Sequence, residues 1–444
     1  MDYIADLLKL FDMSSGVSID TRTLKAGEIF FALKGENFDG NDFVPAALEK
    51  GALAAVTSSK RFAGDGRVFV VPGALEALQA LATAHRRRLD VPVVGITGTN
   101  GKTTTKELLC SMLGSKYRTL CTKGNLNNHI GVPLNILALN KNHQVAVIEM
   151  GASAPGEIDF LCRIAMPTHA LITSVGRAHI EGFGSFENVI KTKTELYRYV
   201  KEAGNYFFYN KDLKDISKEI EDYPGLVKFN ARDFDGNHIE KVEMKNTYPF
   251  LELHFATKDK EGLDVKTKIY GEYNFVNIVN AAKIADFFDV PVQEIKDALE
   301  DFIPAGNRSQ VVRWHGNKLI LDAYNANPTS MQQAIKSFSK IKSPSPKIMI
   351  LGDMLEMGQE SHEAHYGIAR LVDSLADKSL QKVYFIGGEF YKVKDKPFAN
   401  GERFVFVRER DSIANEIQSP SFTGNIVLVK GSRGIGLEKL FNSL

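Results

Sequence analysis

The hydrophobic and polar positions of this chain follow two patterns, short apolar runs and longer segments with helical spacing. Three of the apolar runs are "VPVVGITG" (91–98), "HQVAVIEM" (143–150) and "THALITSV" (168–175), and each stops at a polar or glycine-containing turn. Such runs between helix-like segments predict parallel sheets flanked by helices. The turns mark the carboxyl ends of the strands, where open α/β sheets bind their ligands.

Two breaks in this pattern divide the chain into three blocks. One lies near "HRRRLDVP" (85–92), where a basic helix end meets a proline, and the other follows "DFIPAGNRSQ" (301–310). The last block has its own strands in "NKLILDAYN", "KIMILGDM", "KVYFIGG" and "NIVLVKGS". We therefore predict three domains, at residues 1–89, 90–303 and 304–444, in a chain too long for a single core.

Composition narrows the class of protein. With 44% hydrophobic residues, 25% charged residues and a net charge of +1, the chain reads as a soluble globular protein without a nucleic-acid or membrane partner. No apolar run approaches the ~20 residues that cross a bilayer. Three cysteines (Cys110, Cys121 and Cys162) without a C-x-x-C pair make a disulfide framework unexpected. Together with an N-terminus that lacks the basic start of a signal peptide, they favour a reducing cytoplasm.

The stretch "VVGITGTNGKTTTKEL" (93–108) carries the clearest chemistry. It departs from the common P-loop, G-x-x-x-x-G-K-[ST], because Ile96 stands where that pattern has its first glycine. Gly98 and Gly101 still allow a tight turn whose N–H groups face an anion at the start of a helix. Lys102 can then reach the β- and γ-phosphates of a nucleotide, and the Thr103 hydroxyl can bind Mg²⁺. The predicted ATP-binding loop comprises Gly98, Thr99, Asn100, Gly101, Lys102, Thr103 and Thr104.

This loop resembles that of the Mur ligases, a family of amide ligases that also includes the folylpolyglutamate synthases. Further strings follow in the family's order, among them "GNLNNHIGVP", "AVIEMGASAPGEI", "GEYNFVNIVNAA", "DAYNANPTSM" and "LGDMLEMG". The strings "GNLNN", "YNANP" and "LGDM" are most similar to the branch that joins D-alanyl-D-alanine to UDP-N-acetylmuramoyl-tripeptide. The resemblance implies a central P-loop-type parallel-sheet ATPase domain and a C-terminal Rossmann-like α/β domain that binds the acceptor.

The resemblance also implies that the enzyme binds ATP together with Mg²⁺. The family places Mg²⁺ ligands at Glu149, which ends a strand, and at His179, which follows the next one. The lysine of its K-x-E-[IL] motif carries a carbamate, and the matching residue is Lys193. By themselves these residues could equally be a surface carboxylate, a hydrogen-bonded core imidazole and a solvated helix face.

The remaining expectations concern the substrates. By resemblance Asn274 reads adenine, Arg308 approaches the transferred phosphate, and Asp322 binds a ribose hydroxyl, although Tyr273 stands where many relatives have histidine. The first block is expected to hold the uridine diphosphate, where an arginine fork suits phosphate. The predicted substrate-binding residues are Ser18, Asp20, Thr21, Arg22, Asn125, Asn127, Asn128, Asn325, Asp353, Lys430, Ser432 and Arg433.

The expected activity is ATP-dependent amide formation through an acyl phosphate, with Lys102, Lys193, His179 and Arg308 as the catalytic residues, in a monomer that builds peptidoglycan precursors. Two alternatives stay open. One is a sister ligase that adds an L-amino acid, for which a "DNPR" string is expected where this chain has "NANP". The other is a non-catalytic nucleotide-binding regulator. "SHEAH" (361–365) is set aside as a zinc motif, because its second histidine comes one residue too early for H-E-x-x-H.

Overall fold

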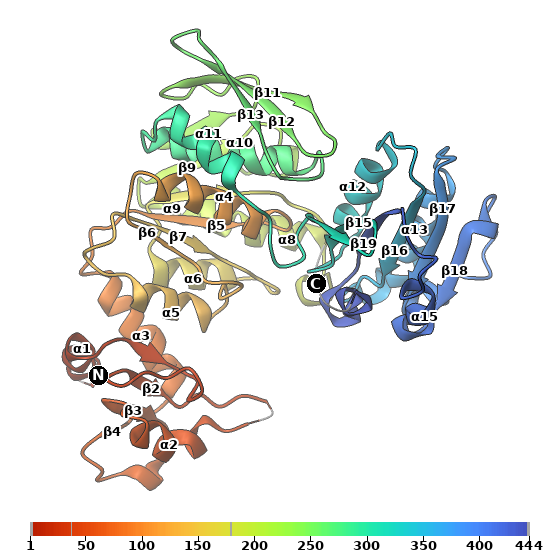
Figure 1. Ribbon diagram of the computed structural model, residues 1–444. Helices are drawn as coiled ribbons and strands as arrows, with labels where there is room; N and C mark the ends of the chain where they lie inside the picture. Colours follow the sequence, from red (N-terminus) through yellow and green to blue (C-terminus); the bar gives the residue numbers. More distant parts are fainter. Residues whose placement is uncertain (1–2, 37, 178–179, 442–444) are drawn as a thin grey trace.

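The computed structural model describes residues 3–36, 38–177 and 180–441. Figure 1 shows the chain passing through a small N-terminal layer, a central sheet with helices on both faces, a green antiparallel layer and a blue C-terminal sheet. His179, which was predicted to bind metal, lies outside the described residues. No helix in the described ranges is long and apolar enough to cross a membrane.

The N-terminal part is built around a parallel sheet of strand order β1-β2-β3-β4. Its elements are α1 (Tyr3–Met13), β1 (Val17–Ser18), β2 (Ile29–Phe31), α2 (Val44–Glu49), β3 (Ala54–Thr57), β4 (Val68–Val70) and α3 (Ala74–Arg86). The short strands β2 and β3 are buried along their whole length, as is usual for parallel strands covered on both faces.

The central sheet is parallel, with the strand order β10-β9-β8-β5-β7-β6. Its elements are β5 (Val93–Thr97), α4 (Lys102–Gly114), β6 (Thr119–Cys121), α5 (Gly131–Ala138), β7 (Val145–Glu149), α6 (Glu157–Ala165), β8 (His169–Ile172), α7 (Ile180–Phe183), α8 (Phe186–Lys193), α9 (Glu195–Glu202), β9 (Tyr206–Asn210) and β10 (Leu226–Phe229). Because side chains alternate along a strand, Val93 packs with the α5 and α6 side, whereas Val94 and Ile96 pack with the α4 side.

An antiparallel sheet of order β11-β12-β13 follows the central strands and was not expected from the sequence. Its elements and the two helices after it are β11 (Ile239–Asn246), β12 (Glu252–Thr257), β13 (Leu263–Lys266), α10 (Asn274–Phe287) and α11 (Val292–Asp301). Burial alternates along β12, so that Leu253 and Phe255 face the core that includes α10 and α11. The helices α10 and α11 then cover α4, the helix that carries the phosphate loop.

The C-terminal sheet has the order β14-β15-β19-β16-β17-β18, parallel except for the hairpin of β14 with β15. Its elements are β14 (Gln310–Trp314), β15 (Asn317–Asp322), α12 (Pro328–Ser339), β16 (Lys347–Gly352), α13 (Ser361–Asp373), β17 (Leu380–Ile386), α14 (Gly388–Tyr391), β18 (Phe404–Val407), α15 (Ala414–Ile417) and β19 (Ile426–Lys430). Met349 and Leu351 of β16 pack with α12 and α13, and Ile350 packs with the opposite face. This agrees with the expected Rossmann-like α/β architecture.

The first and second sheets share one hydrophobic core. Leu7 and Phe31 of the N-terminal part belong to the same buried cluster as Ile136 and Ile158 of the central part, joined through helix α3. The predicted boundaries after residues 89 and 303 fall between the sheets, and they stay a prediction. The expectation of a separate core for each block is corrected for the first two, because α3 packs against α5 and α6.

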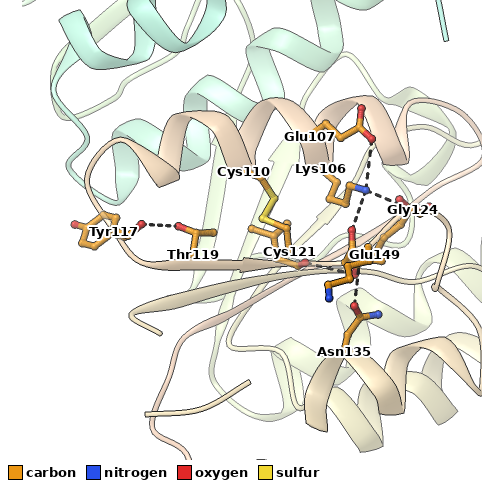
Figure 2. The surroundings of a disulfide bond; sticks show 12 residues. Lys106, Glu107, Cys110, Tyr117, Thr119, Cys121, Gly124, Asn135 and Glu149 are labelled. Carbon is orange, nitrogen blue, oxygen red and sulfur yellow. Dashed lines mark hydrogen bonds and ion pairs between the residues drawn. A yellow bond between two sulfur atoms is a disulfide. The ribbon is translucent and has the colours of Figure 1, made fainter. Parts of the chain in front are cut away.

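The expectation about the cysteines is also corrected. Cys110 of α4 and Cys121 at the end of β6 form a disulfide, whereas Cys162 is free and buried. Helix α4 is the crossover between the parallel strands β5 and β6, so it returns over the sheet and brings residue 110 above residue 121 (Figure 2). One turn earlier, Lys106 donates to the carbonyl oxygens of Thr122 at 3.1 Å and Gly124 at 3.3 Å.

Candidate active site

A cavity of about 930 Å³ opens where the central strands end and the C-terminal sheet faces them. Both parts contribute to its walls, as the strand-end rule predicts. The predicted site residues that line it are Thr99, Asn100, Gly101, Lys102, Thr103, Thr104, Asn125, Asn127, Asn128, Glu149, Asn274, Arg308, Asp322, Asn325 and Lys430. The structure therefore brings most of the predicted nucleotide and acceptor residues together.

The phosphate loop is closely constrained by its two glycines. Gly98 has φ +146° and Gly101 has φ +81°, and a Cβ atom at these positions would meet the Thr173 hydroxyl and the Asn277 carboxamide. Only glycine satisfies both the backbone conformation and the close approach. The loop then enters α4 directly, so the positive end of a 13-residue helix faces the cavity.

Lys102 lies over this loop. Its Nζ donates to the carbonyl oxygens of Gly98 at 2.7 Å and Thr99 at 3.2 Å. Burial lowers the pKa of the Lys102 ammonium, and the Glu149 carboxylate opposes this shift. A cation that is held by carbonyl oxygens at the start of a helix is suited to neutralising phosphate.

Glu149 is the clearest candidate for a metal ligand. It is only 1% exposed, at the end of β7. Its Oε1 accepts a 2.7 Å hydrogen bond from Asn127 Nδ2, but its Oε2 has no hydrogen-bond partner among the described residues. Because a buried carboxylate oxygen without a partner is costly, this atom fits a cation ligand. Thr103 lines the same cavity and offers a hydroxyl.

Lys193 ends helix α8 and is 3% exposed, and it is not among the residues that line the cavity. Its Nζ lies 5.5 Å from the centre of the Phe183 ring, and no hydrogen bond or ion pair among the described residues involves this amine. Burial, aided by the charge of Lys102, lowers the pKa of Lys193 to about 7. Glu195, two residues later, instead accepts the backbone N–H groups of Gly156 and Asp159 at 2.9 Å each.

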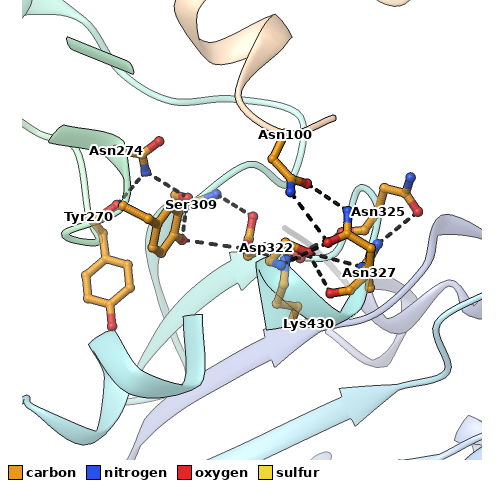
Figure 3. Close-up of polar contacts among 11 residues, drawn as sticks. Asn100, Tyr270, Asn274, Ser309, Asp322, Asn325, Asn327 and Lys430 are labelled. Atoms are coloured by element: carbon orange, nitrogen blue, oxygen red, sulfur yellow. Dashed lines mark hydrogen bonds and ion pairs between the residues drawn. The ribbon is translucent and has the colours of Figure 1, made fainter. Parts of the chain in front are cut away.

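A polar network joins α10 to the C-terminal sheet (Figure 3). The Tyr273 hydroxyl lies 2.7 Å from Ser309 Oγ, and Asn274 Nδ2 donates to the same oxygen at 3.1 Å. Asp322 accepts from Lys430 Nζ at 2.7 Å and from the Ser309 N–H at 3.3 Å. Sequence reasoning missed Ser309, whose only local signal is its place after the "PAGN" junction.

Arg308 projects toward the cavity from this junction. Its guanidinium lies 3.4 Å from the centre of the Tyr324 ring, a close stacking contact that sequence reasoning also missed. Its positive charge is among the causes that lower the pKa of Lys102, so the two cations act on the same region. This is consistent with the expected role of Arg308 near a transferred phosphate.

Three predicted acceptor residues do not line the cavity. Asp353 is 3% exposed, and its carboxylate accepts the backbone N–H groups of Glu389 and Phe390 at 2.9 Å each. Both carboxylate oxygens therefore hold the start of α14, and the substrate-binding role of Asp353 stays a prediction. Ser432 Oγ accepts from the Leu355 N–H, and Arg433 lies 5.6 Å from the Tyr324 ring centre.

The residues predicted for the uridine diphosphate lie in the N-terminal turn, away from the cavity lining. Asp20 accepts the Nε and Nη2 hydrogen bonds of Arg22 and the Arg22 backbone N–H. These bonds lower the pKa of Asp20 to about 2. Ser18 donates to the Asp20 carbonyl oxygen, and Thr21 accepts from Lys50 Nζ through its carbonyl oxygen. The turn presents an exposed, oriented guanidinium.

In "SHEAH", His365 is buried and neutral rather than a ligand. Its Nδ1 lies 2.6 Å from the Ser361 carbonyl oxygen, and its Nε2 accepts from the Met354 N–H at 3.0 Å. Burial lowers the pKa of His365. Both ring nitrogens are therefore committed to the fold.

The comparisons with known proteins match this geometry. Three family models cover the chain: the Mur ligase family catalytic domain at residues 14–93, the Mur ligase middle domain at 96–285 and the Mur ligase glutamate ligase domain at 307–433. A UDP-N-acetylmuramoyl-tripeptide–D-alanyl-D-alanine ligase of Bacillus subtilis is 33% identical over 97% of this chain and 93% of its own length.

Solved structures agree with the sequence relatives. MurF ligase from Thermotoga maritima in complex with ADP superposes with a TM-score of 0.81 at 28% identity, over 97% of this chain and 96% of that one. MurF from Acinetobacter baumannii gives a TM-score of 0.80 at 27% identity, with the same coverage. From these likenesses and from the cavity that joins its phosphate loop to its C-terminal sheet, the chain belongs to the Mur ligase family.

Proposed function

We propose that this protein is an ATP-dependent ligase that adds D-alanyl-D-alanine to UDP-N-acetylmuramoyl-tripeptide during the synthesis of peptidoglycan precursors. The observation that carries the proposal is the single cavity in which the phosphate loop, Glu149 and the asparagine-rich loops of both parts meet. The relatives that match over nearly the whole chain carry this activity in their names. A mere nucleotide-binding regulator has no need for acceptor loops that share a wall with the phosphate loop.

The cavity fits ATP together with Mg²⁺. Among the described residues, no group of three or more His, Cys, Asp and Glu side chains could hold a metal. Mg²⁺ suits such a site, because it commonly takes one or two protein ligands and completes its shell with phosphates and water. Glu149 Oε2 and the Thr103 hydroxyl would hold it. When bound, Mg²⁺ neutralises phosphate charge and orients the group that is transferred.

The chain's own residues then perform two steps. Lys102 and the N-terminus of α4 hold the β- and γ-phosphates while the tripeptide carboxylate attacks the γ-phosphorus, giving an acyl phosphate and ADP. Arg308 stabilises the charge that develops on the transferred group. The amine of D-alanyl-D-alanine next attacks the acyl carbon, and the tetrahedral intermediate loses phosphate and a proton to form the amide. Splitting the reaction replaces a poor electrophile by one with a good leaving group.

We further propose that Lys193 acts as a carbamate. Its buried amine has a pKa near 7, so a neutral amine is available at neutral pH to add carbon dioxide and lose a proton. The resulting anion would sit beside Lys102, the cation named among the causes of its low pKa. As part of the same proposal, His179 would be a ligand of Mg²⁺.

We propose that different parts of the chain bind the different groups of the substrates. Arg22 and its neighbours would hold the uridine diphosphate, Asp322 the ribose of ATP, and Asn125, Asn128 and Asn325 the peptide. We propose that the enzyme works as a monomer. We place the enzyme in the cytoplasm, where ATP and nucleotide-linked precursors are made.

Phosphate release in the presence of ATP and UDP-N-acetylmuramoyl-tripeptide tests the activity. It should require D-alanyl-D-alanine, and the product should gain the mass of the dipeptide. Equal or better turnover of the dipeptide precursor with L-lysine or meso-diaminopimelate would assign the chain to the sister ligases. Nucleotide binding without turnover with any acceptor would favour the regulator.

A further inference from the structure

The phosphate loop makes one side-chain contact with the C-terminal sheet that the reaction does not explain. Asn100 Oδ1 accepts a 2.8 Å hydrogen bond from Asn327 Nδ2, and Asn100 Nδ2 lies 3.5 Å from Asn327 Oδ1. The two residues are 227 positions apart in sequence. Figure 3 shows their carboxamides facing each other between the loop and the start of α12.

The backbone of Asn100 is held by hydrogen bonds of its own, separate from this side-chain contact. Its N–H donates to Ser174 Oγ at 2.8 Å, and its carbonyl oxygen accepts from Thr173 Oγ1 at 2.7 Å and Ser174 Oγ at 2.9 Å. The end of β8 therefore holds the loop at this residue. The Asn100 side chain is not used in these bonds, so it can bind Asn327 on the opposite side.

Asn327 is equally well fixed on its own side. It is the N-cap of α12, where its Oδ1 accepts the Ser330 N–H at 2.9 Å and its N–H donates to Ser330 Oγ at 3.1 Å. Pro328 follows at the first helical position, and Asn327 is 7% exposed. The capping bonds use the carboxamide oxygen, so the amide group is the part that Asn327 can give to Asn100.

Two rigid supports thus meet through one carboxamide pair. A second polar link across this seam, Arg177 to Glu360, joins side chains that are 55% and 41% exposed. Exposed ion pairs contribute little, whereas this amide pair is partly buried, so that fewer water molecules compete for its hydrogen bonds. The amide pair therefore joins the phosphate loop directly to the start of α12.

We propose that Asn100 and Asn327 form a positioning pair that couples the phosphate loop to the docking of the C-terminal sheet, and so to binding of the acceptor. The inference rests on the proposed function. Neither residue needs to touch the reacting atoms for this role. Loss of the pair should weaken the binding of ligands that contact both sides of the seam, and it should spare the binding of the UDP substrate, whose uridine end we propose to lie on the N-terminal part.

Steady-state kinetics with Asn100→Ala, Asn327→Ser and the double variant tests the pair. Serine keeps a capping oxygen for the Ser330 N–H but is too short to reach Asn100. Each single variant should raise the KM for D-alanyl-D-alanine by about three- to tenfold, the size of one net hydrogen bond. The KM for the UDP substrate should stay within about twofold, and the double variant should be no worse than the poorer single variant.

Glu360→Gln is the matched control, since it removes the exposed link across the same seam and should leave both KM values unchanged. An unchanged acceptor KM in Asn327→Ser, or effects that multiply in the double variant, would overturn the pairing. A parallel rise in every KM together with a lowered melting temperature would mean that the residues serve folding alone. Failure of the wild-type enzyme to turn over D-alanyl-D-alanine would instead refute the proposed function.

Discussion

Acid should destabilise the central part of the molecule through His169. This residue lies on β8, 8% exposed, with its ring centre 5.1 Å from that of Tyr206 and 4.8 Å from that of Phe288. Its Nδ1 lies 2.9 Å from Thr168 Oγ1, and Phe208 and Phe287 complete its surroundings. Burial among these aromatic rings lowers the pKa of His169 to about 4.

The sign and size of the effect follow from linkage. The folded state disfavours the proton, so the stabilisation is fully present above the ordinary pKa of 6.5 and is lost as the pH falls toward 4. Between these two values the full effect is about 3 kcal/mol, and at pH 5 about 2 kcal/mol of it is lost. A non-titrating aromatic at this position should remove that part of the pH dependence.

Hydrogen exchange of the β8 amides at pH 7.5 and pH 5 measures the opening free energy of this strand. Wild type should lose about 2 kcal/mol more than His169→Phe between these pH values, while other titrating groups cancel in the comparison. His143→Gln, which changes a partly exposed histidine in the same part of the chain, should behave like wild type. Equal losses in wild type and His169→Phe would refute the reasoning.

Three further outcomes test the site and its frame. Lys193→Ala should lose about 10- to 100-fold in activity and recover part of it with acetate. Lys191→Ala, at an exposed position two residues away, should stay active. A fully active Lys193→Ala would refute the carbamate proposal. Glu149→Gln should need more Mg²⁺ for half-maximal activity, and an unchanged Mg²⁺ dependence would show that Oε2 is not a ligand. Reduction of the disulfide between Cys110 and Cys121, which are 11 positions apart, should lower the free energy of unfolding by about 3 kcal/mol in urea titrations. The double serine variant should show no change in stability with reductant. A wild type whose stability does not change with reductant either would contradict the bond.

The sequence was informative where the chemistry is local. The phosphate loop could be predicted because Gly98, Gly101 and Lys102 lie within five positions of each other, between a strand and a helix. Glu149 could be placed because a strand end has a fixed position in a parallel sheet. These features depend on backbone geometry that a short stretch encodes.

What the sequence did not predict depends on contacts between distant segments. Tyr273 meets Ser309 across 36 positions, and nothing local distinguishes that serine from a turn residue. Asp353 was predicted to bind substrate because it lies in the string "LGDMLEMG", and the N–H groups that its carboxylate accepts come from residues 36 and 37 positions later. Predicting the disulfide would have required knowing which face of α4 packs over β6.

The core that the N-terminal and central sheets share has a mechanical consequence. Because α3 packs with both of them, we expect these two parts to move as one body. The C-terminal part meets that body through polar contacts, such as Tyr273 with Ser309 and Asn100 with Asn327, and through Tyr270, which is buried in the C-terminal core. We therefore expect any opening and closing of the cavity to take place at the 303–309 connection, where Gly306, Asn307 and Ser309 hold left-handed φ angles of 64°, 58° and 53°. For the two non-glycine residues this conformation carries a cost. We therefore expect glycine substitutions at residues 307 and 309 to relieve this conformational cost and to make the connection more flexible, without changing the packing of the parts on either side of it.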